Sequence, residues 1–263
     1  MYSSNLGFDE FFFFSAMLTT LKVKDVLNKE RRFGPLNYLM MLLQRFIRLA
    51  PIYYIVFLIG WQIGPFLGDG PCWFTYEKGF ANCDQYWWSV FTMTINLVPG
   101  YVIANEGCYY WGWYPACEMQ IFLVLPLLVF LIFKTKSKLL QAALVTLGVI
   151  AGLGINAYVI ASNDMAAGLF APQDIYIFKL FVNKPYTKLH AVFLGVGMAL
   201  IYDSIQEYKS EVLTNGQSKS IWKHLHKSSC FAVFSYLIGF FFIAFVTLFP
   251  LPANKNPVKW TTL

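Results

Sequence analysis

Two arginines and several carboxylates stand inside or beside long apolar stretches, where a charged side chain needs a partner. Arg45 and Arg48 are three residues apart near the start of an apolar run, so on a helix they share a face. Asp9 and Glu10 precede four phenylalanines, and Glu118 begins another apolar run. One interpretation is a polar cavity in which the arginines bind an anion such as a phosphate. The other is that the arginines extend to lipid headgroups, with the carboxylates at the membrane interface, and the spacing alone favours this one.

Histidine, the usual general base near neutral pH, occurs only three times. His224 and His226 are two residues apart in a lysine-rich stretch, a spacing that turns them to different faces of a helix and disfavours a shared metal ion. His190 begins an apolar run just after Lys188, so it is a weak candidate for a catalytic base; a hydrogen-bonding role at the membrane interface is the alternative. No G-x-S-x-G, H-E-x-x-H or P-loop motif occurs, and we expect no metal site.

The composition is that of a membrane protein. Of the 263 residues 57% are hydrophobic and only 13% charged, against about 25% charged in soluble proteins. The net charge of +6 comes from Lys and Arg between apolar stretches, with no basic face of interleaved aromatics, so we expect no nucleic-acid partner. These features predict an all-α, polytopic transmembrane helix bundle, a single membrane domain over residues 1–263.

Apolar runs near the roughly 20 residues that a helix needs to span a bilayer predict about six spans. They are Phe8–Val23, Leu39–Gly64, Met119–Phe133, Leu139–Ile160, Leu189–Tyr202 and Phe231–Leu248. Residues 86–102 are ambiguous. If this segment does not span the membrane, fourteen of the twenty basic residues lie on one side. If it does span, only twelve of the twenty lie on one side. The positive-inside rule therefore favours a re-entrant or interfacial segment, both termini on the non-cytoplasmic side, a non-cytoplasmic loop region at 65–118 and a basic loop at 203–229.

Four cysteines fall in the aromatic-rich loop region, on the less positive side of the membrane: Cys72, Cys83, Cys108 and Cys117. Four cysteines allow three disulfide pairings, and the sequence does not choose among them. Disulfides would place this loop in an oxidising compartment; four half-buried thiols are the alternative. The spacing matches no Cys-x-x-Cys knuckle, so zinc is not expected.

Five short motifs follow one another along the chain. They are DEFFFFSAML at 9–18, QRFIRLAPIY at 44–53, Cys83 with Trp87-Trp88 and Asn96, Cys108 with WYPACEMQ at 113–120 and Pro126, and KPYTK at 184–188. In this order they resemble the acyltransferase-3 family of membrane proteins, particularly its animal nose-resistant-to-fluoxetine branch. The family-motif positions are Asp9, Ser15, Tyr53, Trp113, Tyr114, Glu118 and Gln120.

The resemblance implies a multi-helix membrane fold and, in active members, acyl transfer from an acyl-coenzyme A or similar donor to a hydroxyl. Those members carry a general-base His, with an Arg some ten residues before it, on a helix ahead of the phenylalanine motif. This sequence has neither there, and it departs from the motifs at Ala16, Gln44 and Lys188, where the family has Gly, His and Arg. The pattern predicts a truncated, degenerate member that has lost catalysis.

The leading hypothesis is a non-catalytic integral membrane subunit that binds lipid and other membrane subunits within a larger assembly. Arg45, Arg48 and Lys188 would hold anionic phospholipid headgroups, and no cofactor beyond bound phospholipid is expected. If the assembly is an energy-transducing one, the mitochondrial inner membrane would be its site. The alternative is a membrane O-acyltransferase using acyl-coenzyme A, with its catalytic His helix on another chain.

Overall fold

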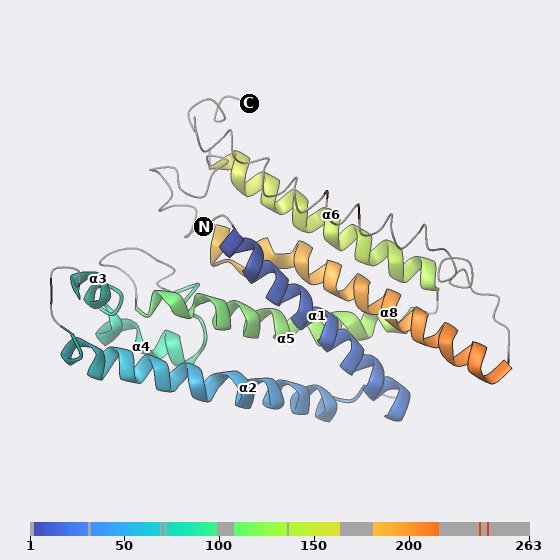
Figure 1. Ribbon diagram of the computed structural model, residues 1–263, viewed down its shortest axis with the longest axis horizontal. Helices are drawn as coiled ribbons and strands as arrows, with labels where there is room; N and C mark the ends of the chain where they lie inside the picture. Colours follow the sequence, from blue (N-terminus) through green and yellow to red (C-terminus); the bar gives the residue numbers. More distant parts are fainter. Residues whose placement is uncertain are drawn as a thin grey trace.

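The described part of the chain is built from helices alone. A computed structural model describes residues 3–30, 33–68, 70, 73–98, 108–135, 137–163, 181–215, 237 and 241, and no strand occurs among them. The helices are α1 (Ser3–Glu30), α2 (Pro35–Leu58), α3 (Trp73–Lys78), α4 (Cys83–Phe91), α5 (Trp113–Lys134), α6 (Lys138–Ser162) and α8 (Leu189–Asn215) (Figure 1). A π-turn, η1 (Ile59–Ile63), and a 3-10 turn, η2 (Gly64–Phe66), extend α2, and η3 (Tyr110–Gly112) and η5 (Pro185–Lys188) lead into α5 and α8.

Within the described ranges, four helical segments are long and apolar enough to cross a membrane. They are Pro35–Phe66, Trp113–Lys134, Lys138–Ser162 and Pro185–Thr214. The expected span at 8–23 lies in α1, which is helical but is not among the four; charged residues such as Asp9, Lys22 and Lys24 make it more polar. The expected span at 231–248 lies outside the described residues apart from 237 and 241. The prediction of about six spans is therefore not confirmed.

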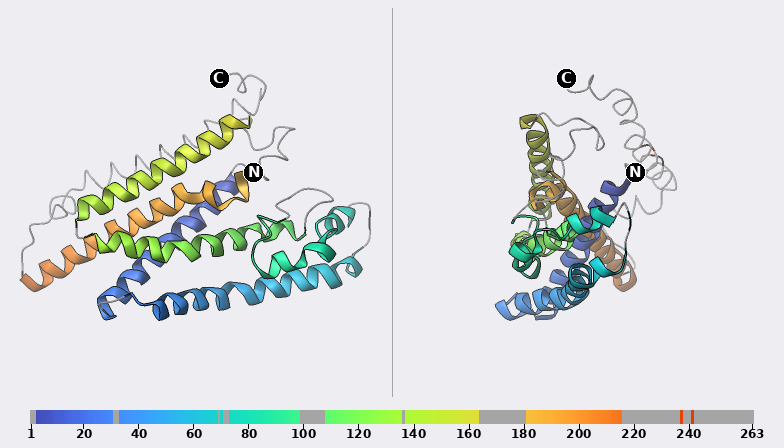
Figure 2. Two further views of the ribbon diagram at one scale, coloured as in Figure 1. Left: turned by 180° about the vertical axis from the view of Figure 1, so that it is seen from behind. Right: turned by 90° about the vertical axis from the view of Figure 1, so that its left-hand side faces the viewer.

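The long helices run alternately up and down the bundle. α1 packs chiefly against α8 and also against α5, while α6 packs on α8 and α2 on α5. α2 and α6 consequently lie on opposite outer sides (Figures 1 and 2). Because α1, α5 and α8 run in the same direction, their N-terminal ends lie at the end of the bundle that also carries α3 and α4 (Figure 1). The motifs at these N-terminal ends therefore lie at the same end of the bundle.

Two glycines let neighbouring helices approach closely. A Cβ atom at Gly195 of α8 would lie 2.2 Å from the carbonyl oxygen of Phe13 in α1. A Cβ atom at Gly152 of α6 would lie 2.5 Å from the backbone nitrogen of His190. Small residues at helix contacts are the usual device for close packing in membranes, because apolar side chains gain little there by leaving lipid.

Replacing Gly195 with alanine is expected to destabilise the bundle by about 1–3 kcal/mol, because the new methyl group forces α1 away from α8. Gly154→Ala is the matched control: nothing lies within 4 Å of a Cβ there, so alanine should be neutral or slightly stabilising in a helix. Unfolding of both variants in mixed micelles, followed by circular dichroism, measures the difference. Equal stabilities would contradict the close α1–α8 contact.

In its described residues, the region between α2 and α5 contains only short helices. α4 has nine residues, which at a rise of about 1.5 Å per residue is less than half of a bilayer core of about 30 Å. Turns follow it up to residue 98, with Met93 at a φ of 53°. Over its described residues the segment 86–102 therefore contains no single helix long enough to cross the membrane, and its re-entrant or interfacial position stays a prediction. The stretch expected as a basic loop, 203–229, begins inside α8, and its residues after 215 lie outside the described part.

Candidate functional site

Residues that are far apart in the sequence meet at the N-terminal ends of α1 and α8. Lys188 Nζ lies 2.9 Å from Asp9 Oδ1, and the lysine side chain is only 3% exposed. His190 Nε2 lies 3.9 Å from the second carboxylate oxygen of Asp9. One carboxylate therefore faces both a buried ammonium group and an imidazole.

The imidazole of His190 is also held on its other side. Its Nδ1 lies 3.0 Å from the carbonyl oxygen of Thr187 and 3.2 Å from Asn156 Nδ2. That carbonyl can only accept hydrogen bonds, and it also accepts one from Asn156 Nδ2 at 3.0 Å. When Nδ1 donates to Thr187, Nε2 is unprotonated and faces Asp9. In that tautomer His190 could take a proton, and the carboxylate would stabilise the resulting imidazolium.

A second ion pair lies deeper in the bundle. Arg45 Nη2 of α2 donates to Glu118 Oε1 of α5 and to Ser15 Oγ of α1. The arginine and glutamate side chains are 16% and 8% exposed, and the guanidinium carbon lies 5.0 Å from the centroid of the Phe122 ring. The charges of this buried arginine and glutamate compensate each other, and their contacts join three helices.

Arg48 differs from Arg45 in its exposure and in its partners. Its side chain is exposed, and within the described ranges it has no ion pair or hydrogen bond. The surrounding surface of α2 is apolar, with Ile47 61% and Ile52 69% exposed. Of these two arginines, Arg45 therefore forms an ion pair inside the bundle, whereas Arg48 is exposed.

Side-chain amides fix the turn after α4 against α5. Asn96 and Gln120 exchange two hydrogen bonds, of 3.0 and 2.7 Å. Asn96 Nδ2 and Cys117 Sγ both donate to the carbonyl oxygen of Asn183, at 3.1 and 3.0 Å. Lys184 Nζ donates to the carbonyl oxygen of Asn96 at 2.8 Å. Cys117 is a free, buried thiol, which corrects its inclusion among the possible disulfide cysteines.

A disulfide joins Cys83, at the start of α4, to Cys108, ahead of α5. This confirms a disulfide in the loop region and selects one pairing; Cys72 lies outside the described residues. Tyr109, next to the bridge, packs against Tyr53 of α2 with ring centroids 5.4 Å apart, and burial raises the pKa of the Tyr109 phenol above its ordinary value. Disulfides persist in oxidising compartments, and the non-cytoplasmic position of this loop region stays a prediction.

The remaining motif positions form an aromatic contact between α1 and α5. Trp113 and Tyr114 both lie against Phe8, with ring centroids 5.0 and 5.7 Å apart. Tyr53 also donates a hydrogen bond to the carbonyl oxygen of Gly112 at 3.4 Å. These residues hold the N-terminal ends of α1 and α5 together, next to the two ion pairs.

The sequence analysis did not single out Asn156, and it named Thr187 only as part of the KPYTK motif. An amide inside the apolar run at 139–160 was the available signal, because polar groups in spans need partners. Thr187 has no signal of its own, since its carbonyl oxygen rather than its side chain contacts the histidine. No group of three or more potential metal-binding side chains occurs in the part of the chain that the structure describes.

Comparison with known proteins gives one distant relative. Nose resistant to fluoxetine protein 6 of Caenorhabditis elegans is 28% identical over 169 residues, which make up 61% of this chain and 18% of that protein. No protein-family model matches the chain, and no solved structure matches it either. The chain thus covers less than a fifth of the relative's length. The similarity gives weak support to the resemblance noted in the motifs, and the four long apolar helices indicate a membrane protein.

Proposed function

We propose that this chain is a non-catalytic membrane subunit with an acyltransferase-like helical fold, which binds anionic phospholipid and partner subunits within a larger membrane assembly. In this role the motif residues hold the helices together, and the surface of the bundle makes the contacts with lipid and protein. Arg48 is the residue that we assign to the anionic headgroup.

The proposal rests on a difference in ion pairing among the three candidate cations, Arg45, Arg48 and Lys188. Arg45 and Lys188 are neutralised by Glu118 and Asp9 inside the bundle, so they are not free for an added anion. Arg48 is exposed on an apolar helix and is unpaired within the described ranges. A charge in that position is unfavourable in hydrocarbon, and a phosphate or a partner's carboxylate would compensate it.

Arg48→Gln is therefore expected to weaken anionic lipid binding about fivefold, since one basic residue contributes about 1 kcal/mol to such binding. Mass spectrometry of lipids that co-purify with the protein in mild detergent measures the change. Lys29→Gln is the control, because Lys29 is a 78% exposed partner of Asp25 in the last turns of α1. An unchanged lipid profile in Arg48→Gln would count against the role of Arg48.

A second candidate function is O-acyl transfer, and the position of His190 next to Asp9 favours it. A histidine whose Nε2 faces a carboxylate can act as a general base towards a hydroxyl. Lys188 pairs with the same carboxylate, and this competition reduces the effect of the Asp9 carboxylate on the imidazole. The acyl donor would be an acyl-coenzyme A or a similar thioester, and a catalytic helix could also come from another polypeptide.

Acyl-coenzyme A turnover by the purified protein distinguishes the two candidates. If His190 is the base, His190→Gln should lower turnover by roughly 100-fold or more, the usual contribution of a general base. Turnover at the uncatalysed rate in the intact protein, with its lipid binding retained, would favour the non-catalytic role.

A further inference from the structure

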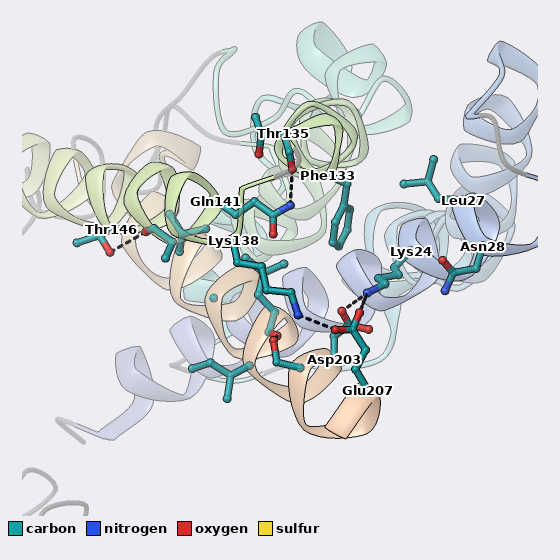
Figure 3. Close-up of a pocket in the computed structure, with 16 residues that line it drawn as sticks. Lys24, Leu27, Asn28, Phe133, Thr135, Lys138, Gln141, Thr146, Asp203 and Glu207 are labelled. Atoms are coloured by element: carbon teal, nitrogen blue, oxygen red, sulfur yellow. Dashed lines mark hydrogen bonds and ion pairs between the residues drawn. The ribbon is translucent and has the colours of Figure 1, made fainter. Parts of the chain in front are cut away.

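A cavity of about 660 Å³ lies at the end of the bundle opposite Asp9 and His190. Its walls come from the last turns of α1, the end of α5, the start of α6 and the middle of α8 (Figure 3). The volume is within the range of about 300–1,000 Å³ that is typical of small-molecule sites. No feature of the motifs or of the proposed function involves it.

Four charged side chains meet at this cavity (Figure 3). Lys24 of α1 pairs with Asp203, and its Nζ also lies 3.0 Å from Glu207 Oε1 on α8. Lys138 of α6 pairs with the other oxygen of Glu207 at 2.6 Å. Two positive and two negative groups therefore line the cavity, and their charges cancel.

The four groups differ in how firmly they are held. Lys24 and Asp203 are 21% and 22% exposed, whereas Glu207 and Lys138 are 45% and 72% exposed. An exposed ion pair contributes little to stability, so the Lys138–Glu207 contact can open at small cost. A ligand can thus contact the ammonium group of Lys138 and the carboxylate of Glu207 while the Lys24–Asp203 pair stays in place.

The rest of the lining is largely apolar. Phe133, Val145, Leu200 and Ile201 form part of the wall, and Lys24 Nζ lies 5.8 Å from the Phe133 ring centroid. The cavity lies where α5 ends at Lys134 and α6 begins at Lys138. Helix ends that carry basic residues mark the headgroup level of a bilayer. The cavity consequently combines a charged site at headgroup level with an apolar wall beside it.

We propose that this cavity binds a zwitterionic phospholipid with a primary ammonium headgroup, of the phosphatidylethanolamine type. The lipid phosphate contacts Lys138, its ammonium group donates hydrogen bonds to Glu207, and part of an acyl chain lies along the apolar wall. An anionic lipid would instead face two carboxylates, and a simple cation would face two ammonium groups. A choline headgroup has no N–H to donate to Glu207. This inference does not depend on Arg48 or on the proposed function.

Native mass spectrometry of the intact protein, titrated with phosphatidylethanolamine, phosphatidylcholine and phosphatidylglycerol of identical acyl chains, tests the proposal. We expect phosphatidylethanolamine to bind most tightly. Lys138→Gln and Glu207→Gln should each weaken it about tenfold, as loss of a charge-assisted hydrogen bond does. Asp25→Asn, which removes an exposed pair in the same turns of α1 outside the cavity lining, should have no effect.

Ala142→Trp provides a variant that keeps all four charges. Ala142 lines the cavity and is exposed, so the indole should fill the space and prevent binding without disturbing the ion pairs or the fold. Binding that survives Ala142→Trp, or equal affinity for all three lipids, would overturn the proposal. A preference for phosphatidylglycerol would also overturn it and would assign the cavity to an anion.

Discussion

Replacing Arg45 with glutamine is expected to lower the free energy of unfolding by about 3–5 kcal/mol, the usual loss when one member of a buried ion pair is removed. The loss arises because the Glu118 side chain, only 8% exposed among α1, α2 and α5, would lose its partner. Chemical unfolding in mixed micelles, followed by circular dichroism, measures it.

A double-mutant cycle separates the ion pair from the loss of arginine packing on Phe122. Glu118→Gln alone should also destabilise the protein, because it leaves the guanidinium unpaired. The double variant should recover most of the loss, since two neutral amides can hydrogen-bond to each other. Lys29→Gln, in an exposed pair, should leave the transition unchanged. Purely additive single effects would contradict a coupled pair.

Removing the disulfide by the double change Cys83→Ala and Cys108→Ala is expected to lower the free energy of unfolding by about 2–4 kcal/mol. The bridge closes a loop between residues 25 positions apart, and without it the unfolded chain gains the conformational freedom of that loop. Thermal unfolding with and without a reductant measures the effect.

The same experiment contains its own control. Reductant should lower the melting temperature of the natural protein and should leave that of the double variant nearly unchanged, because the bridge is already absent there. Cys117 remains a free thiol in both proteins. A natural protein that is insensitive to complete reduction would show that the bridge does not stabilise the fold.

Hydropathy predicted four of the long apolar helices, but not where the helices end. The expected span at 139–160 corresponds to α6, Lys138–Ser162, because lipid requires every backbone group of an apolar run to be bonded within a helix. α1 instead continues to Glu30 and α8 to Asn215. Their polar ends are stabilised by ion pairs such as Lys24 with Asp203, which an apolar run does not reveal.

The partners of the charged residues could not be read from the sequence. The three-residue spacing suggested that Arg45 and Arg48 act together. The pairing of Arg45 with Glu118, however, depends on which face of α2 packs on α5. Lys188 reaches Asp9 only because α8 lies against α1. The disulfide pairing was open for the same reason, since loop geometry and not spacing brings Cys83 to Cys108.

The native mass of the protein, extracted in mild detergent and analysed together with everything that migrates with it, tests the proposed function most directly. We expect migration within a complex of several membrane subunits, with bound anionic phospholipid and no acyl-coenzyme A turnover by the complex. Migration as a single chain, or with one partner that carries an arginine and a histidine about ten residues apart on a transmembrane helix, together with turnover, would contradict it and would establish the acyltransferase.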